Sequence, residues 1–370
     1  MISIPTAFSA SYQEARKKFL EAAATASLPI QSLNHPLPGR DGETLAMDVV
    51  LDGAPDAQQL LIVSSACHGV EGYCGSGVQV FALHDADWRA KAKAAGVAVL
   101  YIHALNPHGF SHVRRVTHEN VDLNRNFQDF SKALPVNPGY AELHPVMLPA
   151  QWPPAPENVA THADFIKTKG MKALQDIISR GQHTHADGLF YGGVAPTWSN
   201  ATLRGVLRQY GARCARLAWI DLHTGLGPRG VGERIFACRD DQVAFARAKK
   251  WWGNQGNPSG ETPITSIYDG SSTSSYLTGL MWGAAYEECP QAEYTSIAME
   301  YGTQDQAQVI QALRADHWLH MHPDNADQAQ AAQIKQQIKD AFYVDADDWK
   351  GMIVSQARQA MFQAVDGLAA

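Results

Sequence analysis

The sequence lacks several features that would place it quickly in a class of proteins. Its five cysteines are scattered without C-x-x-C spacing, so neither a disulfide framework nor a cysteine-rich zinc site is favoured. It contains no run of about 18 uninterrupted apolar residues, which argues against a transmembrane span. The first residues show no cationic leader followed by an apolar stretch. We therefore expect no secretory signal and a cytoplasmic protein.

An excess of charge of one sign is also absent. The 370 residues include 30 Lys and Arg against 37 Asp and Glu, which gives a formal net charge of −7. No basic run stands out, which argues against nucleic acid as a partner. Neither a G-x-S-x-G nucleophile motif nor a G-x-x-x-x-G-K-[ST] phosphate loop occurs, so a serine hydrolase and an NTPase are disfavoured. Hydrophobic residues make up 45% of the chain, which is typical of a globular protein with a substantial core.

Helical and strand-like segments alternate along the chain and predict an α/β fold. Apolar residues at helical spacing predict a surface helix over about 9–24, and a strand is expected near 44–51. Continuous apolar runs at 60–63, 97–102, 217–220 and 296–299 predict buried strands, with one helix over about 75–95 between the first two. That order favours a right-handed β-α-β crossover. The Pro-rich stretch 135–156 is expected to be irregular.

Three of the predicted strands are followed by side chains that can bind a metal. His68 and Glu71 come after the first apolar run, His223 after the third, and Glu300 after the fourth. In open α/β sheets the ligand crevice lies outside the carboxyl ends of the strands, where these segments would meet. Imidazole nitrogen and carboxylate oxygen suit zinc, which needs three protein ligands in a catalytic site. H-x-x-E alone is weak evidence, because such pairs are frequent by chance.

A second polar block lies between residues 106 and 127. It contains the adjacent Arg114 and Arg115, and then Asp122, Asn124 and Arg125. This block could be a surface loop with turn residues. However, an arginine can grip a carboxylate or steady an oxyanion, and a carboxylate can orient a zinc-binding histidine. These are the parts that a zinc hydrolase needs in addition to its ligands.

Taken together, the motifs resemble those of a known superfamily. CHGVEG, NPHGF followed by an arginine and VDLNRNF, DLHTG and AMEYGT occur in the order found in zinc carboxypeptidases of the carboxypeptidase A type, also called funnelins. The similarity is greatest to a bacterial branch, and the aspartoacylase and succinylglutamate desuccinylase branch is more distant. The resemblance implies an α/β/α sandwich around a mixed, twisted sheet of about eight strands. It also implies one domain over 1–370, with inserted loops at about 128–160 and 181–200 and a helical tail at about 304–370.

The resemblance also implies roles for individual residues around one zinc ion per chain. His68, Glu71 and His223 match the zinc ligands, and Glu300 matches the general base. Arg115 matches the arginine that stabilises the oxyanion, with Arg114 as the alternative.

Further matches concern the substrate and the surroundings of the ligands. Asn124 and Arg125 match the pair that grips the terminal carboxylate of the substrate, and Asp122 matches the carboxylate behind the first zinc histidine. Tyr276 is the candidate for the tyrosine that closes over the substrate. Val70 stands where the digestive enzymes carry a further substrate-binding arginine.

Three functions remain open at the level of the sequence. The first is a metallocarboxypeptidase acting on short peptides. The second is a zinc-dependent deacylase of N-acyl amino acids, which would use the same residues. The third is a non-catalytic binding protein on the same scaffold, which would have no need of the general base. We expect a small substrate and neither a nucleic acid nor a membrane partner, and the sequence leaves open whether the chain forms a homo-oligomer.

Overall fold

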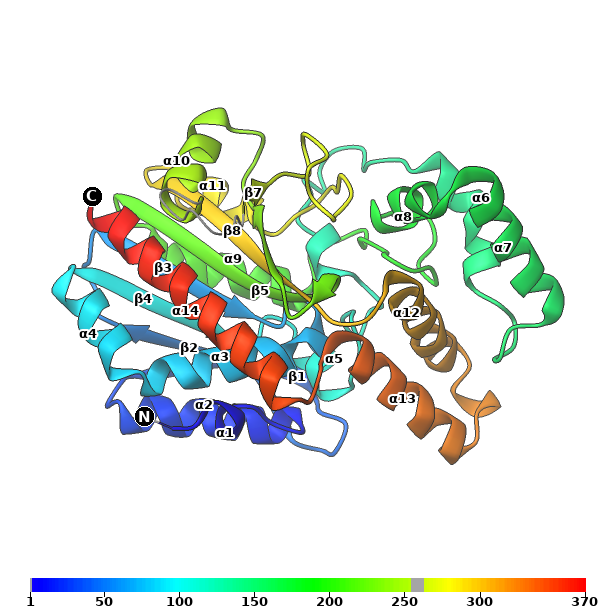
Figure 1. The fold of residues 1–370 in the computed structure, drawn as a ribbon, viewed down its shortest axis with the longest axis horizontal. Coiled ribbons are helices and arrows are strands. Elements are labelled where there is room, and N and C mark those ends of the chain that lie inside the picture. Colours follow the sequence, from blue (N-terminus) through cyan, green and yellow to red (C-terminus); the bar gives the residue numbers. More distant parts are fainter. Residues whose placement is uncertain (1, 254–262) are drawn as a thin grey trace.

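The centre of the molecule is a single mixed sheet. The computed structural model describes residues 2–253 and 263–370 (Figure 1). The strands of these residues are β1 (Ile30–Pro38), β2 (Thr44–Asp52), β3 (Gln59–Ser65), β4 (Val97–His103), β5 (Arg216–Arg229), β6 (Gly232–Phe236), β7 (Ile264–Thr265) and β8 (Glu293–Gly302). They form an eight-stranded sheet in the order β1-β2-β4-β3-β5-β8-β6-β7.

The middle of the sheet is parallel and buried. β3 pairs in parallel with β4 and β5, and β5 pairs in parallel with β8. Their continuous apolar runs are explained by helices on both faces, because such strands meet no water on either side. The strands predicted at 60–63, 97–102, 217–220 and 296–299 are thus confirmed. In the register of these strands Ser64 pairs with Asp221, and His223 pairs with Glu300.

Helices cover both faces of the sheet. The α-helices are α1 (Ile4–Ala7), α2 (Tyr12–Thr25), α3 (Gly72–His84), α4 (Ala86–Ala94), α5 (Pro107–Ser111), α6 (Pro138–Met147), α7 (Pro156–Lys169), α8 (Met171–Ser179), α9 (Trp198–Gly211), α10 (Gln242–Trp252), α11 (Gly283–Glu288), α12 (Gln306–Met321), α13 (Gln328–Phe342) and α14 (Asp347–Ala369). α3, α4, α10 and α14 pack against the strands, and α9 lies behind the sheet in Figure 1. The α/β/α sandwich with a mixed sheet is therefore confirmed.

Five helices form a lobe beyond the carboxyl ends of the parallel strands. We call α6, α7, α8, α12 and α13 the helical lobe; they lie to the right of the sheet in Figure 1. The expectation of an irregular stretch at 135–156 was wrong, because α6 occupies much of it. Pro138 stands in the first turn of α6, where the missing N–H of proline is no loss.

The prediction of a single helix over 75–95 is also wrong, because two helices occupy this range. α3 ends at His84 and α4 begins at Ala86. Asp85 separates them in an extended conformation, and its side chain accepts a hydrogen bond from the backbone N–H of Trp88. A cap of this kind starts a new helix, because it satisfies a donor that the first turn leaves free.

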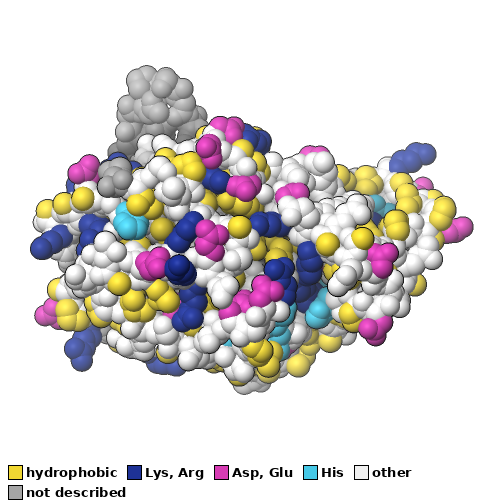
Figure 2. Space-filling model, turned by 90° about the horizontal axis from the view of Figure 1, so that it is seen from below, with side chains coloured by type: hydrophobic (Ala, Val, Ile, Leu, Met, Phe, Trp, Pro, Cys, Tyr) yellow, Lys and Arg dark blue, Asp and Glu magenta, His cyan; other side chains and the backbone are white. Residues whose placement is uncertain are grey.

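The distribution of charge, the character of the helices and the state of the cysteines follow the expectations from the composition. Figure 2 shows acidic and basic side chains intermingled over the face that it presents. Among the residues that the structure describes, no helix combines the length and the apolar character needed to cross a membrane. All five cysteines are free and buried.

Candidate active site and metal centre

Three side chains converge at the carboxyl end of the central strands. His68 follows β3 and precedes the short 3-10 helix η1 (Gly69–Glu71), which ends at Glu71, while His223 lies on β5. One ligand atom from each lies within 4.8 Å of the others, and all three residues are buried. Nδ1 of His68 is 2.8 Å from Oε1 of Glu71, and Nδ1 of His223 is 3.0 Å from Oε2. Two imidazoles therefore present the same type of nitrogen to one carboxylate.

Backbone contacts fix the loop that carries His68 and Glu71. The N–H of Gly69 donates to the carbonyl oxygen of Arg115 at 3.0 Å, and the N–H of Val70 donates to that of Arg114 at 2.8 Å. A Cβ at Gly69 would lie 2.1 Å from the backbone of Gly109, so only glycine allows this close approach. The ligand loop and the arginine segment are thus held as one unit.

A carboxylate lies behind each histidine. Asp122 places Oδ1 3.4 Å from Nε2 of His68. Asp221, which sequence reasoning missed, contacts Nε2 of His223 with its Oδ2. Such partners orient a ligating imidazole and increase its basicity. Although burial opposes it, the carboxylates of Asp221 and Glu71 hold the pKa of His223 well above its usual value.

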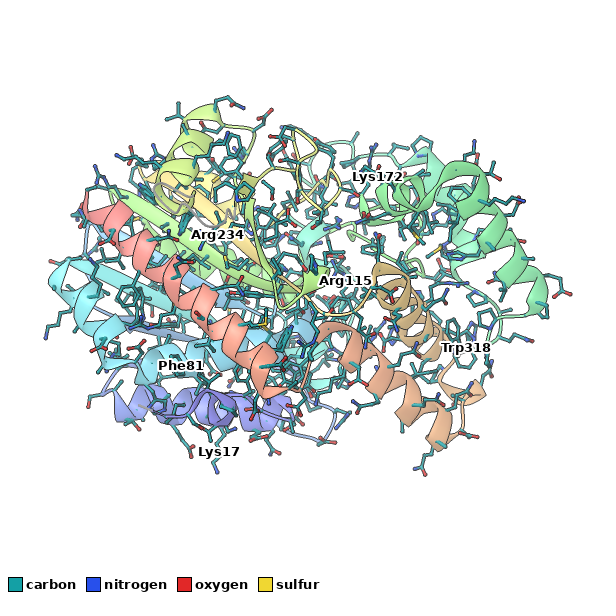
Figure 3. All side chains as sticks on the ribbon, in the orientation of Figure 1. Lys17, Phe81, Arg115, Lys172, Arg234 and Trp318 are labelled. Carbon is teal, nitrogen blue, oxygen red and sulfur yellow. The ribbon has the colours of Figure 1, made fainter. Side chains whose placement is uncertain are left out.

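Of the two adjacent arginines, only Arg115 lies at this site. Its Nη1 is 3.3 Å from Oε1 of Glu71, its Nε donates to Oδ2 of Asp122 at 3.0 Å, and its Nη2 is 2.8 Å from Nε2 of His68. Arg114 turns away and donates to Oδ2 of Asp316 at 3.1 Å. Figure 3 labels Arg115 between the end of the sheet and α12.

Glu300 faces the same centre from β8. It is paired with His223 across the strands, and its Oε1 accepts a hydrogen bond from the N–H of Leu226 at 3.1 Å. Desolvation and the nearby charge of Glu71 raise the pKa of Glu300 to about 8. In contrast, the imidazoles of His68 and His223 overcome the effect of burial and hold the pKa of Glu71 well below its usual range. The two carboxylates therefore differ in how readily they hold a proton near neutral pH.

Asn124 and Arg125 lie on the 3-10 helix η2 (Leu123–Arg125) at the edge of the site. Oδ1 of Asn124 accepts the N–H of Met281 at 3.0 Å. Nε and Nη2 of Arg125 donate to the carbonyl oxygen of Ser179 at 2.8 and 2.6 Å, and Nη1 donates to that of Asn124 at 2.8 Å. Burial lowers the pKa of Arg125 to about 10.

These residues share one cavity. Its empty volume is about 870 Å³, open solvent at its mouth included. The charged residues of the lining are His68, Glu71, Arg115, Arg125, His223 and Glu300. The rest of the lining is uncharged and includes Ile178 of α8, Phe190, Trp282 and, from α12, Val309, Ile310 and Leu313. The helical lobe thus encloses a polar centre with apolar walls.

Tyr276 is not brought to this cavity. Its neighbours Ser275 and Leu277 line the cavity, whereas Tyr276 does not. It is 51% exposed, and its ring lies edge-on to that of Tyr268. Its role as the closing tyrosine stays a prediction.

Comparison with known protein families assigns the chain to one of them. The family model described as "Protein of unknown function (DUF2817)" matches residues 8–356. The chain belongs to the DUF2817 family. No curated protein matches the sequence of this DUF2817 member significantly.

Solved structures similar to this DUF2817 protein include carboxypeptidases. Carboxypeptidase A from Helicoverpa armigera is 10% identical with a TM-score of 0.46, over 90% of this chain and 73% of that chain. Bovine thrombin-activatable fibrinolysis inhibitor, solved with tick carboxypeptidase inhibitor, is 8% identical with a TM-score of 0.47, over 98% of this chain and 97% of that chain.

Proposed function

We propose that this DUF2817 protein is a zinc-dependent hydrolase that cleaves an amide bond next to a free carboxylate, a carboxypeptidase acting on short peptides. One observation carries the proposal: the ligand atoms of His68, Glu71 and His223 lie within 4.8 Å of one another, in the wall of the cavity that Glu300 and Arg115 also line.

The residues at the centre fit a zinc ion. Two imidazoles and one carboxylate form the kind of three-ligand set that catalytic zinc sites use, and it leaves a position open for water or substrate. The structure supports this fit because both Nδ1 atoms face the Glu71 carboxylate and both Nε2 atoms are backed by aspartates. When bound, zinc supplies a Lewis acid that lowers the pKa of water and polarises a carbonyl oxygen.

Glu300 is the residue suited to move the proton. Burial, which raises the pKa of Glu300, suits a carboxyl group that has to accept a proton from water and return it, as a general base and acid do in turn. The hydrogen bond from Leu226 N–H to Oε1 holds the carboxylate in place at 3.1 Å. Glu300 therefore takes the proton of the attacking water and passes it to the departing amine.

Arg115 is the residue suited to stabilise the developing charge. Its guanidinium contacts the carboxylates of Glu71 and Asp122, and these contacts fix its direction before a substrate arrives. A preorganised cation of this kind stabilises the carbonyl oxygen that gains negative charge during attack.

The proposal that the substrate has a free carboxylate rests on a second cation, Arg125, beside Arg115. The guanidinium groups of Arg115 and Arg125 lie 5.3 and 5.8 Å from the centre of the Phe190 ring, so the two cations share one wall of the cavity. Both also face the single carboxylate of Asp122, at 3.0 and 3.9 Å. An anionic group of the substrate would be attracted by these two cations, and Asn124 lies beside them to donate a hydrogen bond.

The walls of the cavity favour a small substrate. α8 and α12 contribute apolar side chains to its lining, so the helical lobe limits the space beyond the polar centre. A short peptide fits this arrangement better than the flexible end of a folded protein. The free, buried cysteines are consistent with the reducing cytoplasm that we propose as the location.

Metal analysis followed by substrate profiling tests the proposal. Protein purified without a metal-affinity tag should contain about one zinc per chain by elemental analysis, and His68→Ala should contain almost none. The zinc-loaded protein should release the C-terminal residue from di- and tripeptides, and the same peptides with a C-terminal amide should be poor substrates. Metal-free and inactive wild-type protein would refute the proposal, and release of an acid from N-acyl amino acids alone would replace the peptidase by a deacylase.

A further inference from the structure

Asp221 is a buried carboxylate beside the centre that takes no part in the proposed transfer of a proton or the binding of the substrate. It is fully buried and engages a different partner with each oxygen. Oδ2 contacts Nε2 of His223, and Oδ1 accepts the hydroxyl of Ser64 at 2.5 Å. Ser64 Oγ in turn accepts the indole N–H of Trp219 at 2.7 Å. A chain of hydrogen bonds therefore runs from Trp219 through Ser64 and Asp221 to His223.

The sheet itself holds this chain of hydrogen bonds in place. Ser64 on β3 and Asp221 on β5 are register partners in the parallel pair. Trp219, Asp221 and His223 stand at every second position of β5, so their side chains leave the same face of the sheet. Because both carboxylate oxygens are engaged by groups on two central strands, the Asp221 carboxylate has one orientation available.

We propose that Asp221 is a positioning residue that fixes the ring and the tautomer of His223, so that Nδ1 offers its lone pair to the metal. The inference rests on the proposed function, because it assumes that His223 is a metal ligand. Oδ2 of Asp221 accepts the proton of Nε2, so Nδ1, which lies 3.0 Å from Oε2 of Glu71, is the nitrogen whose lone pair becomes available when a metal replaces its proton.

The aspartates behind His68 and His223 have different surroundings. Asp122, behind His68, lies 3.4 Å from Nε2 and also contacts the guanidinium groups of Arg115 and Arg125. Asp221 has only hydroxyl and imidazole groups among the contacts described above, so its charge acts on His223 without competition from an arginine. Removing the charge of Asp221 should therefore weaken metal binding more than removing that of Asp122.

The experiment compares zinc binding by the full-length protein and three variants. Asp221→Asn removes the charge and keeps the shape, and Ser64→Ala keeps the charge and removes its anchor. Asp48→Asn is the matched control, because Asp48 is also a fully buried carboxylate on this sheet and contacts Arg16 and Ser32 away from the cavity. Zinc dissociation constants come from competition with a chromophoric chelator, and the spectrum of the cobalt-substituted protein reports on the ligand field.

We expect Asp221→Asn to weaken zinc binding about 10- to 100-fold and to shift the cobalt spectrum. Ser64→Ala should give a smaller loss in the same direction, and Asp48→Asn should bind zinc as wild type does, even if its melting temperature falls. Asp122→Asn should lose less affinity than Asp221→Asn. If Asp221→Asn does not fold, Ser64→Ala carries the test, and its unchanged zinc affinity would overturn the inference.

Two results separate this inference from the proposed function. Wild-type protein that binds no zinc would overturn both. Wild-type protein that binds one zinc, with the same affinity in Asp221→Asn, would overturn only the positioning role. Two metal ions per wild-type chain would also overturn it, because Cys67, Asp221 and His223 lie close enough to form a second ligand set.

Discussion

The carboxyl edge of the sheet and the helical lobe are built in different ways. At the edge, reactive side chains stand on adjacent parallel strands, and strand register places them, as with His223 opposite Glu300. In the lobe, side-chain hydrogen bonds between one helix and another take the place of strand register. Arg314 of α12 donates to the carbonyl oxygen of Met147 at 3.0 Å and to Asn158 at 2.7 Å. The difference suggests that the chemistry and the selectivity of the cavity can be altered independently.

One buried cluster joins the two regions. Asp316 of α12 accepts Nε of Arg114 at 3.1 Å and Nζ of Lys335 of α13 at 2.6 Å. Arg114 precedes Arg115, which lies at the proposed metal centre, so the cluster attaches the lobe directly to the segment that carries Arg115.

The strongest test of the edge is Glu300→Gln. Because glutamine cannot accept the proton of water, we expect kcat to fall by about 100- to 10,000-fold, while zinc content and the substrate profile stay unchanged. Steady-state kinetics and elemental analysis measure these quantities. Turnover equal to that of wild type would show that Glu300 is not the base.

The adjacent Arg114 and Arg115 allow the two regions to be tested separately, because Arg115 contacts Glu71 at the sheet edge and Arg114 contacts Asp316 of the lobe. Arg115→Met should lower kcat/KM by about 100- to 1,000-fold, because it removes a preorganised donor at the oxyanion. Arg114→Met should instead reduce stability, because it leaves Asp316 without one of its two cations. Kinetics and urea unfolding of both variants provide the comparison. The reverse pattern, with catalysis lost in Arg114→Met, would contradict the assignment.

The contribution of Asp316 to the stability of the lobe should depend on pH. Although burial opposes it, the charges of Lys335 and Arg114 lower the pKa of Asp316. A lowered folded pKa gives stability that is present above the unfolded value of about 3.9 and is lost as the pH falls through the folded pKa.

Asp316→Asn should therefore cost about 2 to 3 kcal/mol at pH 7, and the difference from wild type should shrink below about pH 4. Urea unfolding across this range measures it. Zinc content at pH 7 serves as the control, since the proposed metal ligands belong to the other region. A difference that stays constant down to the lowest pH would contradict the low folded pKa.

The smallest expected effect concerns the apolar wall. Ile178→Ala on α8 enlarges the cavity, so we expect kcat/KM to shift by about 10-fold towards substrates with bulkier side chains. Leu174→Ala is the control, because Leu174 is fully buried on the same helix but does not line the cavity. A panel of dipeptides read out by kcat/KM should distinguish the two variants, and identical profiles would show that α8 does not shape selectivity.

The local pattern of apolar residues was sufficient to predict the strands that carry the candidate site residues. Apolar runs predict β3, β5 and β8, and parallel strands bring their carboxyl ends to one edge, so the meeting of His68, Glu71, His223 and Glu300 follows from order along the chain. The choice between Arg114 and Arg115 does not follow from that order, because both residues have the same chemistry and the carboxylate that binds Arg114, Asp316, is 202 residues away.

Other features depend on contacts that the pattern does not contain. Asp221 stands two residues before His223, which places both on one side of a strand, but its second partner, Ser64, lies on another strand and 157 residues away. The ring of Tyr276 packs edge-on to that of Tyr268 and not against the cavity, which its position in the sequence does not reveal. The prolines of 135–156 indicated irregular structure, yet one of them starts α6.

The proposed metal ligands are also separated widely along the chain, and this has a consequence for folding. Glu71 and His223 are 152 residues apart, and all five cysteines are free. An ion held by His68, Glu71 and His223 would act as a reversible cross-link that closes a long loop, as a disulfide does in other proteins. Uptake of the ion and completion of the central sheet then become linked equilibria, so loading with metal also selects the folded chain.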